Sequence, residues 1–228
     1  MIIITGASGG IGNSIIEELS KRDTILCLYH SSKPADLFKN DRTEPVQLDI
    51  TNEADVKKFI SDHRAQFKNI TLVHFATVNI DGLVMTFDFA DWKKIMDVNV
   101  NGNFLLTSNL LPLMIAGNWG RIIHISSVVG KNGMKGAAAY SASKTALEGW
   151  SRSLSKEYGR FNITSNILNL GYFEVGLINH LNDSDREKII KDIPSQKLGK
   201  TSNIINAIYF LMDSEYVNGA LIDIHGGL

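Results

Sequence analysis

The chain of 228 residues contains one cysteine, four prolines and no excess of charge of either sign. A single cysteine, Cys27, excludes an intramolecular disulfide and a thiolate metal cluster, so we expect a buried structural thiol. Lysine plus arginine number 23 against 24 aspartate plus glutamate, which gives a formal net charge of -1. A nucleic-acid or anionic membrane surface requires a clustered basic excess. We therefore expect no nucleic-acid partner.

Long hydrophobic runs are also missing. No stretch approaches the roughly 18 apolar residues that a membrane span needs. The N-terminal segment MIIIT is too short for the core of a signal peptide and has no basic leader. These two absences predict a cytoplasmic protein with no membrane partner.

Two kinds of segment alternate along the chain. Short β-branched runs predict strands at 2–5, 24–29, 45–50, 70–76, 121–126, 163–168 and 220–225. Segments with helical periodicity lie at 11–22, 53–66, 91–116, 137–158 and 201–213. Strands that are apolar on both faces are typical of a parallel sheet covered by helices. The pattern predicts an α/β fold, a doubly wound parallel sheet of Rossmann type with about seven strands, in one domain over 1–228.

The least regular region is 172–199. It is a candidate for a segment that covers a substrate. A surface-exposed helical pair is an equally good interpretation.

The stretch IIITGASGGIGNSIIEEL predicts a strand, a glycine-rich turn and a helix, with glycines at Gly6, Gly10 and Gly12. A phosphate needs bare backbone N–H groups, close approach and the positive end of a helix, and this arrangement offers all three. Glycine-rich turns also occur for steric reasons alone. The position after the first strand of an α/β alternation favours dinucleotide binding.

The stretch YSASK places Tyr140 and Lys144 four residues apart, on one face of a predicted helix. A free phenol has a pKa of about 10, and a nearby ammonium lowers it toward the range that acid–base catalysis needs. Ser127 lies thirteen residues earlier at the end of a predicted strand, where α/β sheets place their ligands. This setting favours catalysis over the alternative, an ordinary surface pair of tyrosine and lysine.

Several segments, in this order and spacing, resemble the short-chain dehydrogenase/reductase family. They are the turn from Thr5 to Gly12, LDI at 48–50, DVNVNG at 97–102, GRIIHISSVVG at 120–130, YSASK, and the C-terminal stretch 197–227. The subgroup that looks most similar is that of the 3-oxoacyl-[acyl-carrier-protein] reductases, which also contains enzymes acting on sugars and other secondary alcohols. The resemblance implies an NAD(P)-dependent oxidoreductase that moves a hydride between the cofactor and a carbonyl or secondary alcohol. It also implies a small-molecule or acyl-carrier substrate and a homo-oligomer, a tetramer or a dimer, paired through helices 91–116 and 137–158.

The resemblance assigns catalytic roles to four residues. Ser127 would hold the substrate carbonyl, and Tyr140 would donate its proton. Lys144 would lower the pKa of Tyr140 and bind the nicotinamide ribose, and Asn99 would hold a water that links Lys144 to solvent. Ser126 competes with Ser127, but the spacing to Tyr140 favours Ser127.

The cofactor-binding residues implied by the resemblance extend along the chain. They are Gly6, Ser8, Gly10, Ile11, Gly12, His30, Asp49, Ile50, Ala76, Thr77, Tyr140, Lys144 and Gly171. An acidic residue at the end of the second strand would favour NAD, but LYHSSK has none before Asp36. Because His30 and Lys33 could receive a phosphate, the sequence favours NADP(H), with NAD(H) as the alternative.

The sequence departs from the family at several positions. The stretch His74-Phe75-Ala76-Thr77 stands where the family usually has Asn-Asn-Ala-Gly, Leu170 replaces a proline, and Val175 aligns with a usual threonine. Weaker cofactor binding would follow, which leaves a non-catalytic dinucleotide-binding sensor or subunit as the rival function. His74 and His124 are interpreted as core histidines, and no metal site is expected.

Overall fold

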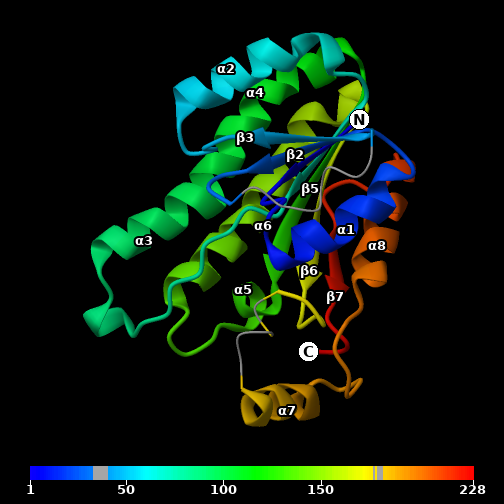
Figure 1. Cartoon of the computed structure of the whole chain (residues 1–228). Helices are drawn as coiled ribbons and strands as arrows, with labels where there is room; N and C mark the ends of the chain where they lie inside the picture. The colour runs from blue at the N-terminus through cyan, green and yellow to red at the C-terminus, as the bar shows by residue number, and fades with distance from the viewer. Residues whose placement is uncertain (33–40, 177, 179–181) are drawn as a thin grey trace.

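The computed structural model describes residues 1–32, 41–176, 178 and 182–228 (Figure 1). Seven strands, all paired in parallel, form one sheet in the order β3-β2-β1-β4-β5-β6-β7. The strands are β1 (Ile2–Thr5), β2 (Ile25–Tyr29), β3 (Thr43–Gln47), β4 (Ile70–His74), β5 (Gly120–Ser127), β6 (Ile163–Leu170) and β7 (Leu221–Ile224). The α-helices are α1 (Gly10–Ser20), α2 (Glu53–His63), α3 (Phe89–Met96), α4 (Gly102–Ala116), α5 (Val128–Asn132), α6 (Ala138–Tyr158), α7 (Asp183–Asp192) and α8 (Thr201–Asp213).

The sheet is buried on both faces because its strands alternate apolar side chains between two cores. In β1, Ile2 and Ile4 pack with residues of α1 and α8, whereas Ile3 packs with residues of α2 and α4. Successive side chains of a strand point to opposite faces, so a fully apolar strand requires a helical layer on each side. Figure 1 shows α1 and α8 together on one side, with α2 and α4 on the other. The prediction of a doubly wound α/β sheet is confirmed.

Some boundaries differ from the prediction. The strand predicted at 45–50 ends at Gln47, and α5 was not expected as a separate helix. Helix α7 lies in the region 172–199, for which a helical pair was one of the two interpretations. The helix predicted at 91–116 is divided into α3 and α4 by a π-helical turn, η3 (Asp97–Asn101). In this turn the Gly102 N–H donates to the Asp97 carbonyl, five residues earlier. One extra residue shifts the helical phase by about 100°, but α4 is apolar nearly all round and has no polar face on which that shift could be seen.

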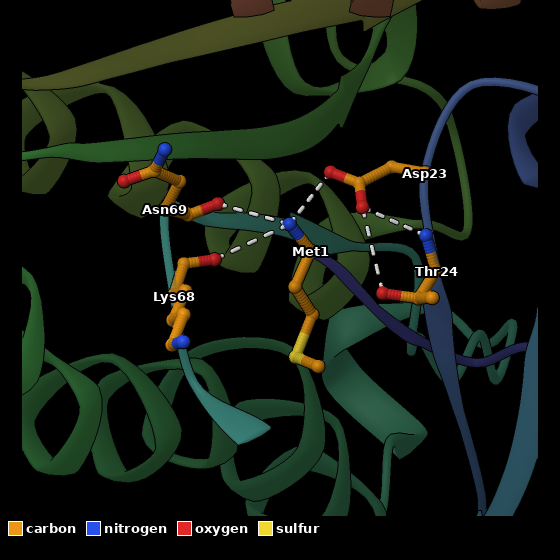
Figure 2. A network of polar contacts seen from close by, with 5 residues as sticks. All are labelled: Met1, Asp23, Thr24, Lys68 and Asn69. Carbon is orange, nitrogen blue, oxygen red and sulfur yellow. Dashed lines mark hydrogen bonds and ion pairs between the residues drawn. The ribbon is translucent and has the colours of Figure 1, made fainter. Parts of the chain in front are cut away.

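At the amino ends of the central strands, the Met1 ammonium group forms a network of polar contacts (Figure 2). Its nitrogen lies 2.6 Å from Asp23 Oδ2 and donates to the carbonyls of Lys68 and Asn69 at 3.3 and 3.2 Å. Asp23 Oδ1 also accepts from the Thr24 N–H at 2.7 Å. One cation therefore ties the start of β1 to the residues that precede β2 and β4.

Two further expectations bear on the class of protein. Cys27 is buried in β2, and burial raises the pKa of its thiol to about 12, so the expected structural role is confirmed. Among the helices in the described ranges, none combines the length and the apolar character that crossing a bilayer requires.

Candidate active site

A cleft of about 1120 Å³ opens at the carboxyl ends of β1, β2 and β4. This is where the strand order reverses, between β1 and β4, and open α/β sheets bind ligands at such a reversal. The residues around it are Thr5, Gly6, Ser8, Gly9, Leu28, Tyr29, His30, Ser31, Leu48, Asp49, Ile50, Thr51, Phe75, Ala76, Thr77, Val78, Asp88, Phe89, Ala90, Lys93, Lys94, Asp97 and Val98. The volume is slightly above the usual range of about 300–1,000 Å³ for small-molecule and cofactor sites.

The glycine-rich turn forms one wall of the cleft, and close approaches explain its glycines. Gly6 has φ +66°, and a Cβ there would lie 2.6 Å from the Ala76 nitrogen. A Cβ on Gly12 would lie 2.4 Å from the Gly6 oxygen, and one on Gly10 would lie 2.6 Å from the Gly176 Cα. The turn thus brings bare backbone and the N-terminus of α1 to the cleft. A dinucleotide phosphate fits this arrangement.

The far end of the cleft carries His30 and Asp49. His30 Nε2 lies 3.8 Å from Asp49 Oδ2, and Asp49 Oδ1 accepts from the Thr51 N–H at 2.9 Å and the Thr51 hydroxyl at 2.7 Å. Burial opposes ionisation of Asp49, but the Thr51 hydrogen bonds and the nearby His30 outweigh it and lower the pKa of this carboxyl. Lys33, the second expected phosphate ligand, lies outside the described residues.

Ser127, Tyr140 and Lys144 meet at the carboxyl end of β5. Ser127 ends β5 and caps α5, where its Oγ accepts from the Val129 N–H at 3.3 Å. Tyr140 and Lys144 lie on the buried face of α6, 9% and 3% exposed. The phenol of Tyr140 lies near the hydroxyls of Ser127 and Thr77. The structure therefore brings three of the four predicted catalytic residues into one cluster.

The electrostatics of the pair differ from the expectation. Lys144 Nζ donates to the Ile125 carbonyl at 2.8 Å and lies 5.5 Å from the centroid of the Tyr140 ring. Burial lowers the pKa of Lys144 to about 8. Burial also raises the pKa of Tyr140, and the nearby hydroxyls of Thr77 and Ser127 offset that only in part. In this structure the ammonium group is directed at a backbone carbonyl, and its role in lowering the pKa of Tyr140 stays a prediction.

Asn99 lies in the π-helical turn η3 and is fully buried. Its Oδ1 accepts from the Val78 N–H at 2.7 Å, and its Nδ2 donates to the Val78 carbonyl at 3.0 Å. The same Nδ2 lies 3.0 Å from Ser143 Oγ, whose hydroxyl donates to the Tyr140 carbonyl at 2.7 Å. The Asn99 side chain therefore joins the segment after β4 to the turn of α6 that carries Tyr140.

The expected cofactor residues fall into two groups. Those that line the cleft are Gly6, Ser8, His30, Asp49, Ile50, Ala76 and Thr77. Those that do not line it are Gly10, Ile11, Gly12, Tyr140, Lys144 and Gly171. Gly171 has a packing reason of its own, because a Cβ there would lie 2.7 Å from the Cα of His225. Ser126 Oγ donates to the Lys144 carbonyl at 3.4 Å, which fits a satisfied strand hydroxyl.

Sequence reasoning missed the contribution of α3 to the cleft. Asp88, Phe89, Lys93, Lys94 and Asp97 all line it. The only available signal was the Asp88 cap, whose Oδ1 accepts from the Ala90 N–H at 2.7 Å. An N-cap residue indicates where a helix begins, but it does not indicate that the helix lines a cleft.

Beneath the site, His74 and His124 are stacked, with ring centroids 5.2 Å apart and planes 4° apart. His74 Nε2 lies 2.9 Å from Thr107 Oγ1, and His124 Nε2 lies 3.3 Å from Ser165 Oγ. Both rings are buried, so the interpretation as core histidines is confirmed. Burial, helped by Lys144, lowers the pKa of His124 to about 3, and burial also lowers that of His74 well below its ordinary value.

Comparison with known proteins identifies the class to which this fold and site belong. Residues 1–186 match the family described as short chain dehydrogenase, and the chain belongs to that family. It is therefore an oxidoreductase whose relatives use a nicotinamide dinucleotide.

Individual relatives match over nearly the whole chain. The chain is 34% identical to Nodulation protein G of Rhizobium sp. (strain N33), over 99% of this chain and 95% of that one. It is 32% identical to 3-oxoacyl-[acyl-carrier-protein] reductase FabG of Escherichia coli (strain K12), over 99% and 96% of the two chains. The crystal structure of 3-oxoacyl-[acyl-carrier protein] reductase from Brucella melitensis ATCC 23457 matches with a TM-score of 0.91 and 25% identity, over 100% of this chain and 90% of that one.

Proposed function

We propose that the protein moves a hydride between a bound nicotinamide dinucleotide and the carbon of a carbonyl or secondary alcohol, with Tyr140 as general acid or base. The observation that carries this is the cluster of Ser127, Tyr140 and Lys144 at the end of β5, in which Tyr140 and Lys144 are buried and Lys144 Nζ lies 5.5 Å from the centroid of the phenol ring. In the reducing direction Tyr140 gives its proton to the carbonyl oxygen. Ser127 donates a hydrogen bond to the same oxygen as charge develops on it.

The test is carbonyl-dependent consumption of the reduced nicotinamide, followed by its absorbance. The panel contains 3-oxoacyl thioesters, sugar ketones and simple ketones, and the matching alcohols are assayed with the oxidised cofactor. Turnover of at least one pair is expected. A protein that binds the dinucleotide but turns over no member of the panel in either direction would support the rival function, a non-catalytic sensor or subunit.

For the substrate we propose a 3-oxoacyl thioester, with an acyl chain delivered on a carrier protein. Support comes from relatives named as 3-oxoacyl-[acyl-carrier-protein] reductases that match 99% of this chain. We further propose that the segment 172–199 covers this substrate. Its first residue, Tyr172, packs against the cluster of Val128, Val129, Ala137 and Tyr140. A sugar or another secondary alcohol is the alternative substrate, and the same panel distinguishes them.

For the cofactor we propose NADP(H), with His30 as a ligand of the 2′-phosphate. His30 is exposed at the end of β2 and lines the cleft. Because hydrogen bonds to charged groups contribute about 1.5–3 kcal/mol, His30→Ala is expected to weaken NADPH binding by about tenfold or more. Binding of NADH should change little. Fluorescence titrations with both cofactors measure this, and wild-type protein that binds NADH tenfold more tightly than NADPH contradicts the proposal.

We also propose a homo-oligomer, a tetramer or a dimer, paired through α4 and α6. Phe104 on α4 is 54% exposed, and its ring centroid lies 6.3 Å from that of Trp150 on α6. Burial of such an aromatic pair against a second copy is favourable. Light scattering is expected to give a multiple of the single-chain mass of 25.2 kDa. A mass of one chain at micromolar concentration contradicts the pairing.

A further inference from the structure

Tyr140 belongs to a small apolar cluster near the carboxyl end of β5, called the catalytic cluster below. Its buried members are Val128, Val129, Ala137 and Tyr140. Tyr172 and Leu228 pack against these four side chains, and both stay partly exposed. The four buried members are at most 9% exposed. An apolar group attached to a carbonyl held at Tyr140 would therefore meet the half-buried surface of Tyr172 and Leu228.

The same two side chains also contact the segment proposed to cover the substrate. They pack against a second apolar cluster, whose buried members are Ile178, Ile193 and Leu198. Tyr172 is the first residue of the segment 172–199, whereas Leu228 comes from the chain that follows β7. These two residues thus connect the covering segment with the catalytic cluster.

Close backbone packing places Leu228 between the two clusters. The Ser195 N–H donates to the Gly226 carbonyl at 3.0 Å, and the Gly227 N–H donates to His225 Nδ1 at 3.2 Å. Gly226 has φ +71°, and a Cβ there would lie only 2.5 Å from Ser195 Oγ. The glycine at this position lets residues 225–228 lie against the covering segment. That contact sets where the Leu228 side chain leaves the backbone.

The Asp223 carboxylate ties the same stretch of chain to α5. Asp223 Oδ2 accepts from Lys131 Nζ of α5 at 3.1 Å, and Asp223 Oδ1 accepts from Asn169 Nδ2 of β6 at 2.6 Å. His225 Nε2 lies 3.4 Å from the same Oδ1. Helix α5 also contributes the two valines of the catalytic cluster. One carboxylate therefore holds the start of the segment that carries Leu228 beside β6 and α5.

We propose that Leu228 is a specificity-determining residue: beside Tyr172, it contacts the alkyl chain of a 3-oxoacyl thioester, on the side of the reacting carbonyl that lies away from the sulfur. This inference deepens the proposed function and rests on it. Each methylene group that leaves water on binding adds to affinity, so this contact favours long alkyl chains over short ones. A sugar chain gains little from it, because hydroxyl groups replace the apolar surface.

The test compares Leu228→Ala, which removes most of the apolar side chain, with Leu228→Met, which keeps its volume. The substrates are 3-oxoacyl thioesters of N-acetylcysteamine with acyl chains of four to ten carbons, and kcat/KM is measured for each. The matched control is Leu113→Ala, which removes a half-buried leucine of α4 that packs against the core beside α2. Thermal melting followed by circular dichroism shows whether each variant is folded.

The expected effect is a loss of chain-length preference. In Leu228→Ala the ratio of kcat/KM for the longest chain to that for the shortest should fall by about tenfold. Leu228→Met and Leu113→Ala should keep the wild-type ratio. An unchanged ratio in Leu228→Ala, an equal fall of kcat/KM at every chain length, or the same fall of the ratio in Leu113→Ala overturns the inference. Should Leu228→Ala fail to fold, Leu228→Val tests a smaller loss of the same contact.

A binding measurement separates this inference from the proposed function. Tyr140→Phe protein with reduced cofactor is titrated by calorimetry with the longest and the shortest thioester, so no turnover is needed. Tighter binding of the long chain, lost when Leu228→Ala is added, supports the inference even if the wild-type protein reduces no carbonyl and the proposed function fails. An active enzyme whose chain-length preference does not depend on position 228 loses only the inference.

Discussion

Tyr140→Phe is expected to lower kcat by about 10²–10⁴-fold at every pH, because it removes the group proposed to transfer the proton. The ring remains, so its packing against Val128, Val129 and Ala137 is kept. Cofactor affinity should change by no more than about tenfold, since a single neutral hydrogen bond of about 0.5–1.5 kcal/mol is the most the phenol could contribute. Steady-state kinetics at several pH values and a cofactor titration measure the two effects.

The matched control removes a tyrosine hydroxyl at an exposed position. Tyr216 is 100% exposed, so Tyr216→Phe should leave kcat and KM at wild-type values. Ser127→Ala should show an intermediate loss of about 10²–10³-fold, because it removes stabilisation of the developing charge and leaves the proton donor in place. Near-normal turnover in Tyr140→Phe would contradict the role of Tyr140 as proton donor, because the described part of the site offers no other buried phenol beside Ser127.

The fold could be predicted because it depends on local patterns. The alternation of β1 between two cores, with Ile2 and Ile4 on one side and Ile3 on the other, is a property of a strand of four residues. The glycines of the first turn could be predicted for the same reason, since each removes a clash with backbone nearby. Periodicity and glycine placement need no knowledge of distant contacts.

The clustering of Ser127, Tyr140 and Lys144 could be predicted from the sequence, but the contacts of these side chains could not. The sequence placed Tyr140 and Lys144 on one helix face, and both are there. The direction of Lys144 Nζ could not be predicted, because it depends on a carbonyl of β5 that becomes reachable only when α6 packs on the sheet. Polar contacts between distant segments depend on how helices and strands pack together, and the residue pattern of one segment does not specify that packing.

The stacked pair His74 and His124 leads to the second large expected effect, a loss of stability in mild acid. The two rings come from neighbouring strands, where they are paired in register. The charged group nearest to both is Lys144, and its charge adds to burial in keeping them neutral. The folded state therefore favours the neutral form of both imidazole rings.

The direction of this pH dependence follows from the number of protons that the folded and the unfolded chain bind. The pKa of His124 falls from 6.5 to about 3 on folding, so below pH 6.5 the unfolded chain binds a proton that the folded chain does not. Stability from this residue is complete above pH 6.5 and is lost progressively as the pH falls toward 3. At pH 5 the loss is about 2 kcal/mol for His124, at about 1.4 kcal/mol per pH unit. His74 adds a loss of the same sign, because its pKa also lies well below the ordinary value.

Urea unfolding at pH 7.5, 6.5, 5.5 and 5.0 measures the expected slope, and His124→Asn should flatten it between about pH 6.5 and 5. The substitution also removes the ring that stacks on His74 and packs against Trp150, 4.7 Å away between ring centroids. His124→Asn is therefore expected to be less stable at pH 7.5 and yet to lose less on acidification. The matched control is His30→Asn, which removes an imidazole that is 73% exposed, and its slope should stay closer to that of wild type than the slope of His124→Asn. An equal slope in wild type and His124→Asn would mean that His124 is protonated in the folded chain as readily as in the unfolded one. A charge at that position would lie against the Lys144 ammonium group, so this outcome would also require Lys144 to be neutral or to point elsewhere.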